Sequence, residues 1–167
     1  VIAEAERLRA ANIYLGGSFG STVTGTCNVM AAAAMAEGTS IIESAACEPE
    51  VTDFGNFLNA MGAKIEGLGT PFLKIEGVER LHSVDYEIIP DRIEAVTLMI
   101  GAVMTGGDIT IENLCPGHLT AIIEKLREIG IPITLSTANA QPGRCHVRVE
   151  APTTIRSTEL SALPYPG

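Results

Sequence analysis

The chain has 167 residues, of which 46% are hydrophobic and only 4% aromatic, and it contains no Trp. This length allows a substantial core built from aliphatic side chains. The net charge is −9, and the 11 Lys and Arg residues are not clustered. That balance argues against nucleic acid or an anionic membrane surface as a partner, because both need grouped basic side chains.

The cysteines and histidines lack the spacing of a metal site or a disulfide framework. The four Cys include no C-x-x-C pair and the three His are scattered. We therefore expect reduced thiols in a cytoplasmic protein, with no metal site. The apolar runs Val29–Ala36 and Ala95–Met104 are shorter than the roughly 20 residues of a membrane span. Val1 opens without a signal-peptide pattern.

The first elements in chain order lead to a glycine-rich loop and an apolar helix. A charged lead-in, Val1–Ala10, precedes a short strand at Ala11–Leu15 and a turn-rich loop at Gly16–Gly20. The stretch Thr24–Ala36 then predicts a helix closed by Gly38. Because this helix is apolar all round, we expect it to be buried on every side.

Residues 20–62 and residues 88–130 repeat one pattern. Met30 corresponds to Met99 at an offset of 69 residues, and Gly38 corresponds to Gly107 at the same offset. The strand residues 42–44 match 111–113 at 69 residues, and Gly62 matches Gly130 at 68. Each copy contains a buried helix, a glycine, a short strand, a proline-started amphipathic helix, another glycine and a strand. A repeat of this length indicates that a whole supersecondary unit was duplicated.

The strands and second helices of the two copies set the fold class. The strands alternate apolar with polar residues, as at 63–66, 73–76 and 109–112, which predicts sheets with one wet face. The second helices, Glu50–Met61 and Gly117–Ile129, follow Pro49 and Pro116 at helix-start positions. Buried helices combined with half-exposed sheets favour an α/β fold of repeated βαβαββ units around inner helices.

A domain crossing is predicted at Pro90-Asp91. This dipeptide follows an expected strand at Tyr86–Ile89 and precedes the second apolar helix, Ile93–Met104. The tail from Ala151 to Gly167 is irregular and ends without a cap or closing strand. We therefore expect the chain to be an internal piece of a longer protein.

The loop Gly16–Thr26 is the best candidate for a ligand site. Its glycines allow close backbone approach, and Ser21, Thr22 and Thr24 supply hydroxyls before a helix N-terminus. This combination favours a phosphate or diphosphate. The loop matches neither the Walker pattern nor G-x-G-x-x-G. The alternative, a turn with a Ser/Thr helix cap, stays open.

Two groups of charged residues have both a structural and a functional interpretation. Glu48 and Glu50 suit the N-terminal dipole of a helix, but the second copy carries no acid there, so a ligand or interdomain role is also possible for them. Asp91, Arg92 and Glu94 cluster at the predicted crossing. They form either a hinge network of salt bridges or contacts to substrate.

The remaining reactive side chains have simple structural interpretations. Cys115 is expected to be inert, because no His or basic group adjoins it to lower its pKa. His118, at the exposed start of a helix, and His82, in a loop, are expected to be solvated surface residues.

Together these segments resemble a known enzyme family. The stretch 22–67, with its EGT, IIE and EPE strings, and the segments IEGVERL at 75–81 and IIPDRIEAVT at 88–97 carry the resemblance. It covers nearly the whole chain and points to bacterial UDP-N-acetylglucosamine enolpyruvyl transferases, of the first committed step of peptidoglycan synthesis. A related family that acts on shikimate 3-phosphate has loops that do not match in this way.

The resemblance implies a fold and a reaction. The family fold is an inside-out α/β barrel of repeated βαβαββ units with buried helices, arranged in two domains. Residues 1–90 would end one domain, and residues 91–167 would begin the return into the other. The reaction transfers enolpyruvyl from phosphoenolpyruvate to the 3′-hydroxyl of UDP-N-acetylglucosamine and releases phosphate. No cofactor, nucleic acid or membrane is implied.

The resemblance also assigns roles to residues. Gly20, Ser21, Thr22 and Val23 match the loop that contacts the nucleotide-sugar diphosphate. The charged positions match the acidic pair and the interdomain cluster of the family; these are Glu48, Glu50, Asp91, Arg92 and Glu94. The catalytic Cys and Asp segments would lie outside this chain, so we expect it to be inactive alone. The rival hypotheses are a non-catalytic nucleotide-sugar-binding module and the shikimate 3-phosphate enzyme.

Overall fold

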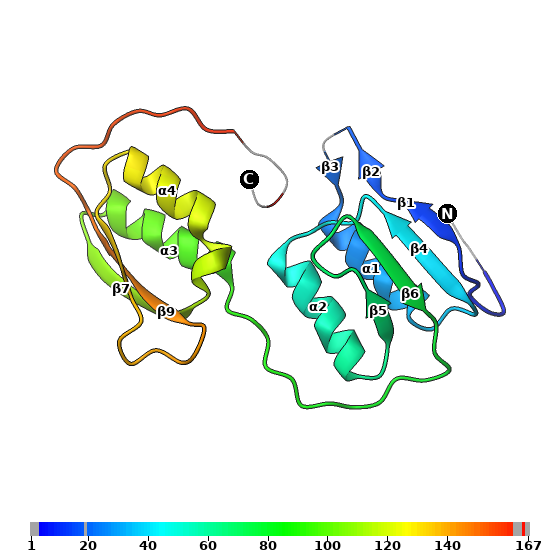
Figure 1. The fold of residues 1–167 in the computed structure, drawn as a ribbon. Coiled ribbons are helices and arrows are strands. Elements are labelled where there is room, and N and C mark those ends of the chain that lie inside the picture. Colours follow the sequence, from blue (N-terminus) through cyan, green and yellow to red (C-terminus); the bar gives the residue numbers. More distant parts are fainter. Residues whose placement is uncertain (1–3, 19, 162–164, 166–167) are drawn as a thin grey trace. The chain divides into compact units, whose positions relative to one another are not determined.

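The computed structural model describes residues 4–18, 20–161 and 165. The chain divides into two compact units, the first ending at Ile88 and the second beginning at Ile89. Figure 1 traces the chain through both units. The assignment of residues 1–90 and 91–167 to two different domains of a longer protein stays a prediction.

The first unit has the predicted order of elements. Its main elements are β1 (Asn12–Tyr14), α1 (Val23–Ala33), β4 (Thr39–Glu43), α2 (Pro49–Ala60), β5 (Lys64–Glu66) and β6 (Phe72–Glu76). The strands form a sheet of order β1-β4-β6-β5, in which β1 runs parallel to β4 and the other pairs are antiparallel. A hairpin of β2 (Gly16–Gly17) and β3 (Gly20–Ser21) precedes α1. The βαβαββ unit is therefore confirmed.

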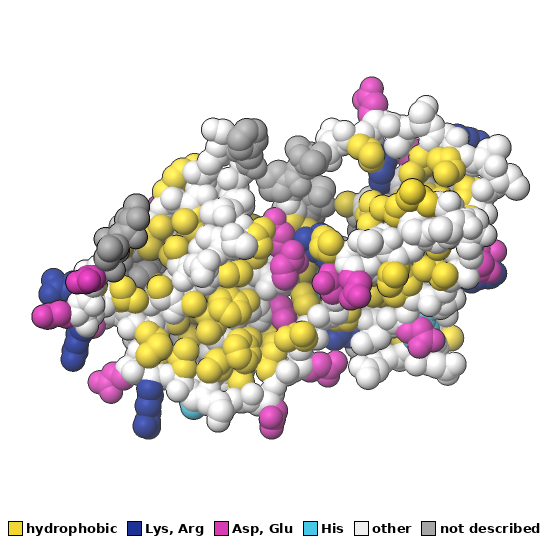
Figure 2. All heavy atoms as spheres, turned by 180° about the vertical axis from the view of Figure 1, so that it is seen from behind, with side chains coloured by type: hydrophobic (Ala, Val, Ile, Leu, Met, Phe, Trp, Pro, Cys, Tyr) yellow, Lys and Arg dark blue, Asp and Glu magenta, His cyan; other side chains and the backbone are white. Residues whose placement is uncertain are grey.

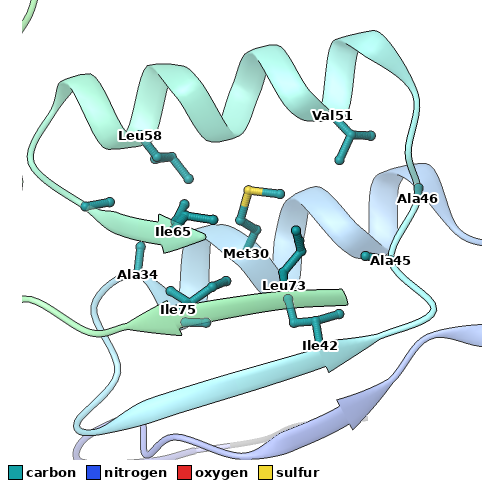
Figure 3. Packing of buried hydrophobic residues seen from close by; sticks show 12 residues of the cluster. Met30, Ala34, Ile42, Ala45, Ala46, Val51, Leu58, Ile65, Leu73 and Ile75 are labelled. Atoms are coloured by element: carbon teal, nitrogen blue, oxygen red, sulfur yellow. The ribbon is translucent and has the colours of Figure 1, made fainter. Parts of the chain in front are cut away.

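Alternation along the strands separates a dry face from a wet face. In β6, Leu73 and Ile75 are buried against the helices, whereas Lys74 points to solvent and pairs with Glu66 across the sheet. Figure 3 shows Met30 of α1 among the buried side chains of the sheet and α2. The core therefore lies between one sheet face and two helices.

The second unit repeats the later part of this order. Its elements are α3 (Arg92–Met104), β7 (Asp108–Leu114), the 3-10 turn η1 (Pro116–His118), α4 (Thr120–Glu128), β8 (Ile133–Ser136) and β9 (Cys145–Glu150). The sheet order β7-β9-β8 repeats β4-β6-β5. The strand expected at Tyr86–Ile89 does not form, and residues 80–91 belong to no helix or strand. Every sheet in the described residues is open.

The duplication extends to the backbone conformation. Ser44 and Asn113, 69 residues apart, both adopt a φ of 58° at the end of a strand. This left-handed conformation is uncommon outside glycine. Gly62 and Gly130 likewise end the second helix of each copy with φ values of 101° and 95°. The two copies therefore share unusual turns as well as the order of their elements.

The two apolar helices bury only one face each. In α3, Met99 is fully buried, whereas Ile93, Ile100 and Met104 are 57%, 41% and 80% exposed. The expected burial on every side is therefore wrong for this chain, because the described residues supply packing on one side only. Hydrophobic side chains accordingly appear on the surface of both units in Figure 2. None of the helices in the described part of the chain combines the length and apolarity needed to cross a membrane.

Candidate functional site

The predicted ligand loop leads into the N-terminus of α1. Gly20 has a φ of 98°, which favours glycine, and it pairs with Gly17 in the β2–β3 hairpin. Thr22 is the N-cap of α1, and its hydroxyl oxygen accepts a hydrogen bond from the Gly25 amide at 3.2 Å. Both earlier interpretations of the loop are compatible with this geometry, since a hydroxyl that accepts one bond still has a proton to donate.

The start of α1 has features that suit an anion. The first amides of a helix have no partner inside it, and the helix dipole places partial positive charge there. The first turn of α1 contains no acidic residue. Ser21 and Val23 flank the cap residue, so all four predicted positions from Gly20 to Val23 gather at this helix end.

A buried threonine connects this helix end to the loop that carries the acidic pair. The hydroxyl of Thr26 donates to the Thr22 carbonyl at 2.7 Å and accepts from the Ala46 amide at 3.0 Å. Thr26 is fully buried. The connection between β4 and α2 is thereby held against the first turn of α1. In the sequence, Thr26 is marked only as a polar residue within an apolar helix, which does not indicate this role.

The predicted acidic residues lie at the start of α2 and differ in burial. Glu48 is the N-cap, but its side chain makes no capping hydrogen bond, and only 9% of the residue is exposed. Its Oε2 atom is buried and has no hydrogen-bond partner among the described residues. Glu50 is exposed in the first turn, where a carboxylate suits the dipole.

Both carboxylates lie close enough to α1 to influence a thiol there. Burial raises the pKa of Cys27, and the charges of Glu50 and Glu48 raise it further. Burial and Glu48 also raise the pKa of Cys47. These thiols therefore stay protonated at neutral pH and are poor nucleophiles. The predicted loop and the acidic pair thus come together at one end of the first unit.

Cys115 has a basic neighbour that the sequence did not indicate. The Nη1 atom of Arg144 donates to its sulfur at 2.5 Å, and the two residues are 29 positions apart. The expectation that no basic group adjoins Cys115 is therefore wrong, because the β7–β9 pairing brings the two segments together.

The charged residues of the predicted crossing surround the start of α3. The Oδ1 atom of Asp91 caps the helix by accepting from the amides of Ile93 and Glu94 at 2.8 and 3.0 Å. Asp91 therefore has a structural role at least. Glu94 is exposed in the first turn, and Arg92 is half-buried.

A small cavity of about 250 Å³ opens beside Arg92. Its walls include His118 and Thr97 together with apolar side chains of α3 and α4. His118 is half-buried, with a buried Nδ1 atom, so its assignment to the solvated surface is wrong. His118 lines the same cavity as residues of α3, and this position accounts for its partial burial. His82 is exposed, as expected.

The groups gathered at these sites suit the binding of a charged ligand. Within residues 4–18, 20–161 and 165, no group of three or more His, Cys, Asp or Glu side chains is arranged to hold a metal ion. The α1 terminus offers amides and a hydroxyl for an anion. Asp91, Arg92 and Glu94 belong to the second unit and are grouped with each other.

The sequence matches one family over its full length. Residues 1–167 match the family described as EPSP synthase (3-phosphoshikimate 1-carboxyvinyltransferase). A protein of Methylacidiphilum infernorum, named UDP-N-acetylglucosamine 1-carboxyvinyltransferase, is 46% identical over 167 residues, which are 100% of this chain and 38% of that protein. A protein of Desulfatibacillum aliphaticivorans with the same name is 45% identical over 98% of this chain and 37% of its own.

Solved structures share the fold. The enolpyruvyl transferase NikO from Streptomyces tendae superposes with a TM-score of 0.77 at 25% identity, over 95% of this chain and 39% of that one. EPSP synthase from Acinetobacter baumannii gives a TM-score of 0.55 at 22% identity, over 89% of this chain and 32% of its own, which bears on the fold alone. These neighbours confirm the predicted fold class. The chain spans less than two fifths of the length of the relatives it matches.

Proposed function

The chain belongs to the EPSP synthase family of carboxyvinyltransferases, and from this premise we propose a specific reaction for the intact protein. It transfers enolpyruvyl from phosphoenolpyruvate to the 3′-hydroxyl of UDP-N-acetylglucosamine and releases phosphate. The observation that carries the proposal is the 46% identity, over the whole chain, to a protein named for this reaction.

The geometry at the start of α1 supports a nucleotide sugar as one substrate. A UDP-sugar carries a diphosphate, and helix N-termini bind such groups through free amides and the helix dipole. Thr22 adds a hydroxyl proton, and Gly20 and Ser21 bring the hairpin backbone close. In this proposal Gly20, Ser21, Thr22 and Val23 contact the diphosphate.

The remaining predicted residues are assigned to the surroundings of the substrates. Glu48, Glu50, Asp91, Arg92 and Glu94 are proposed to act near the reacting groups or to support the residues that do. Arg92, beside its cavity, is the one cation in this set. Asp91 has the additional task of capping α3.

The reaction needs proton-transferring groups in addition to the binding groups of this chain. The sugar hydroxyl loses a proton and attacks C2 of the enolpyruvyl group, while C3 gains a proton to give a tetrahedral ketal. Loss of phosphate and of a C3 proton then restores the double bond. We assign these proton transfers to Cys and Asp segments outside residues 1–167. The chain described here supplies binding and is expected to be inactive alone.

We place this reaction in the cytoplasm, where both substrates are soluble. Its product is the precursor that commits UDP-N-acetylglucosamine to peptidoglycan, so the protein would serve cell-wall synthesis, cell shape and division. No cofactor, nucleic acid or membrane takes part in the proposed reaction.

One specific observation favours a second candidate. The matching family is described by its action on 3-phosphoshikimate, so a shikimate 3-phosphate transferase belongs to the same class. The identity of 46% to the M. infernorum protein favours the nucleotide sugar over shikimate 3-phosphate as the substrate. A non-catalytic nucleotide-sugar-binding module is the third reading, from a different functional class.

Substrate discrimination tests the proposal directly. The intact protein is supplied with phosphoenolpyruvate and either UDP-N-acetylglucosamine or shikimate 3-phosphate, and released phosphate is measured. We expect release with the nucleotide sugar only. Release with shikimate 3-phosphate alone supports the second candidate, and binding of UDP-N-acetylglucosamine without release supports the module. The 167-residue chain serves as the control, in which we expect no release.

A further inference from the structure

Glu48 is a buried carboxylate that the first unit does not satisfy. Its Oε2 atom has no hydrogen-bond partner, and no ion pair of the described residues involves Glu48. A buried charge without a partner is strongly unfavourable, so native proteins pair such groups. The α2 dipole alone is a weak compensation, because the side chain makes no bond to the helix amides.

Three of the five basic side chains of the first unit are engaged with other carboxylates. Arg7 pairs with Glu37 at 2.5 Å, and Lys74 with Glu66 at 3.4 Å. Lys64 pairs with Glu76 in the same sheet. The sheet pairs lie on its wet face, opposite to the helices. None of these cations reaches the buried oxygen of Glu48.

The repeat shows what fills the equivalent position in the second copy. Glu48 precedes the helix-start residue Pro49, and Cys115 precedes the corresponding Pro116. In the second copy, the Arg144 guanidinium contacts the Cys115 sulfur at 2.5 Å. At this backbone position, the second copy has Cys115, which contacts a cation of its own unit. The first copy has Glu48, whose buried oxygen has no partner in its own unit.

We propose that Glu48 anchors a cation-binding site, filled by a guanidinium or ammonium side chain from the part of the intact protein outside residues 1–167. The relatives are more than twice as long as this chain, so such a side chain is available to them. A guanidinium offers several donors in a fixed fork and matches a carboxylate well.

This cation has a consequence for the neighbouring anion site. Glu48 raises the pKa of Cys27 in α1, so its negative charge acts on the helix whose N-terminus is proposed to bind a diphosphate. An unpaired Glu48 would therefore repel the diphosphate. A cation that pairs with Glu48 removes this repulsion between the carboxylate and the diphosphate. This consequence rests on the proposed function, whereas the cation site itself does not.

Melting temperatures of variants of the intact protein test the site without any activity measurement. We expect Glu48→Gln to lower the Tm by at least about 2 °C, because it leaves the incoming cation buried and unpaired. Glu48→Lys should lower it more, and Glu48→Asp less. Glu43→Gln, at an exposed position on β4, is the matched control and should leave the Tm unchanged.

The same Glu48→Gln substitution should have the opposite sign in the 167-residue chain. There the cation is absent, so neutralising the buried carboxylate should raise the Tm by about 2–4 °C. A Tm that rises or stays constant in the intact protein overturns the proposal. A Tm that falls equally in both proteins also overturns it, since the carboxylate is then satisfied locally. If the intact protein needs added spermidine for its full Tm, the cation is a soluble one and the proposed source is wrong.

Discussion

The hydroxyl of Thr26 accepts a hydrogen bond from the amide of Ala46 at 3.0 Å, and both residues are buried. This bond joins the helix that follows the ligand loop to the connection that carries Glu48. It also satisfies a buried backbone donor, which would otherwise cost the desolvation of that group. The two parts of the candidate site therefore depend on one buried side chain, which is itself not among the predicted ligand contacts.

Replacing Thr26 with Val should destabilise the first unit. Val keeps the shape of the side chain but removes the acceptor, so the Ala46 amide is left buried without a partner. We expect a loss of about 1–3 kcal/mol in the free energy of unfolding. Urea unfolding of the 167-residue chain measures it. Thr24→Val, at an exposed position of the same helix, is the control, with a change within about 0.5 kcal/mol.

The sequence predicted the local elements well because each has a strong local signal. The start of α2 at Pro49 and the glycine stops at Gly62 and Gly130 follow from fixed backbone preferences. The strand expected at Tyr86–Ile89 failed for a non-local reason: an apolar alternation becomes a strand only if a neighbour pairs with it. The single amphipathic helix expected at Gly117–Ile129 instead divides into η1 and α4.

The candidate site was predictable only in part. The loop before α1 and the cap at Thr22 could be located from residue types and spacing. The approach of Arg144 to Cys115 could not, because it depends on the register between β7 and β9. The burial of Glu48 could not be predicted either, because the sequence places a carboxylate at a helix start but does not give its exposure.

Replacing Thr22 with Asp should separate ligand binding from capping. Asp is as good an N-cap as Thr or better, so stability should change little. Its negative charge should repel a diphosphate at the same helix end. We therefore expect the KM of the intact protein for UDP-N-acetylglucosamine to rise at least about tenfold, equivalent to ~1.4 kcal/mol. Steady-state kinetics at saturating phosphoenolpyruvate provides the measurement.

The matched control for this test is Thr22→Asn. Asn also caps helices well but is neutral, so its effect on KM should be much smaller than that of Asp. If Thr22→Asp and Thr22→Asn give the same KM as the original protein, the loop is a helix cap and the diphosphate binds elsewhere. A fall in Tm without a change in KM has the same meaning.

Replacing Met104 with Lys should have different effects in the 167-residue chain and in the intact protein. Met104 is 80% exposed at the end of α3, so the chain alone should lose no more than about 0.5 kcal/mol. The substitution should also reduce binding of the dye ANS to the apolar face. We expect the intact protein to lose roughly 2 kcal/mol or more, because further packing would cover this face.

The control for the apolar face is the buried side of the same helix. Met99 is fully buried, so Met99→Ala should cost about 2–5 kcal/mol in both proteins. Equal and small effects of Met104→Lys in both proteins would mean that this face of α3 stays exposed to solvent in the intact molecule. Chemical unfolding of the four variants gives the comparison.

Replacing Arg92 with Ala in the intact protein tests whether the charges at the start of α3 serve the reaction or the scaffold. Arg92 is half-buried at a cavity of about 250 Å³, where a guanidinium can meet an anionic group. A role at the substrate predicts that kcat falls at least about tenfold, or ~1.4 kcal/mol in the barrier, while the Tm of the unliganded protein changes little. A scaffold role predicts a large fall in Tm with near-normal turnover by the protein that remains folded. Arg7→Ala, whose side chain is 78% exposed, should alter neither quantity. Measuring kcat and Tm on the same purified variant therefore decides the role of Arg92, and a loss of Tm alone assigns it to the scaffold.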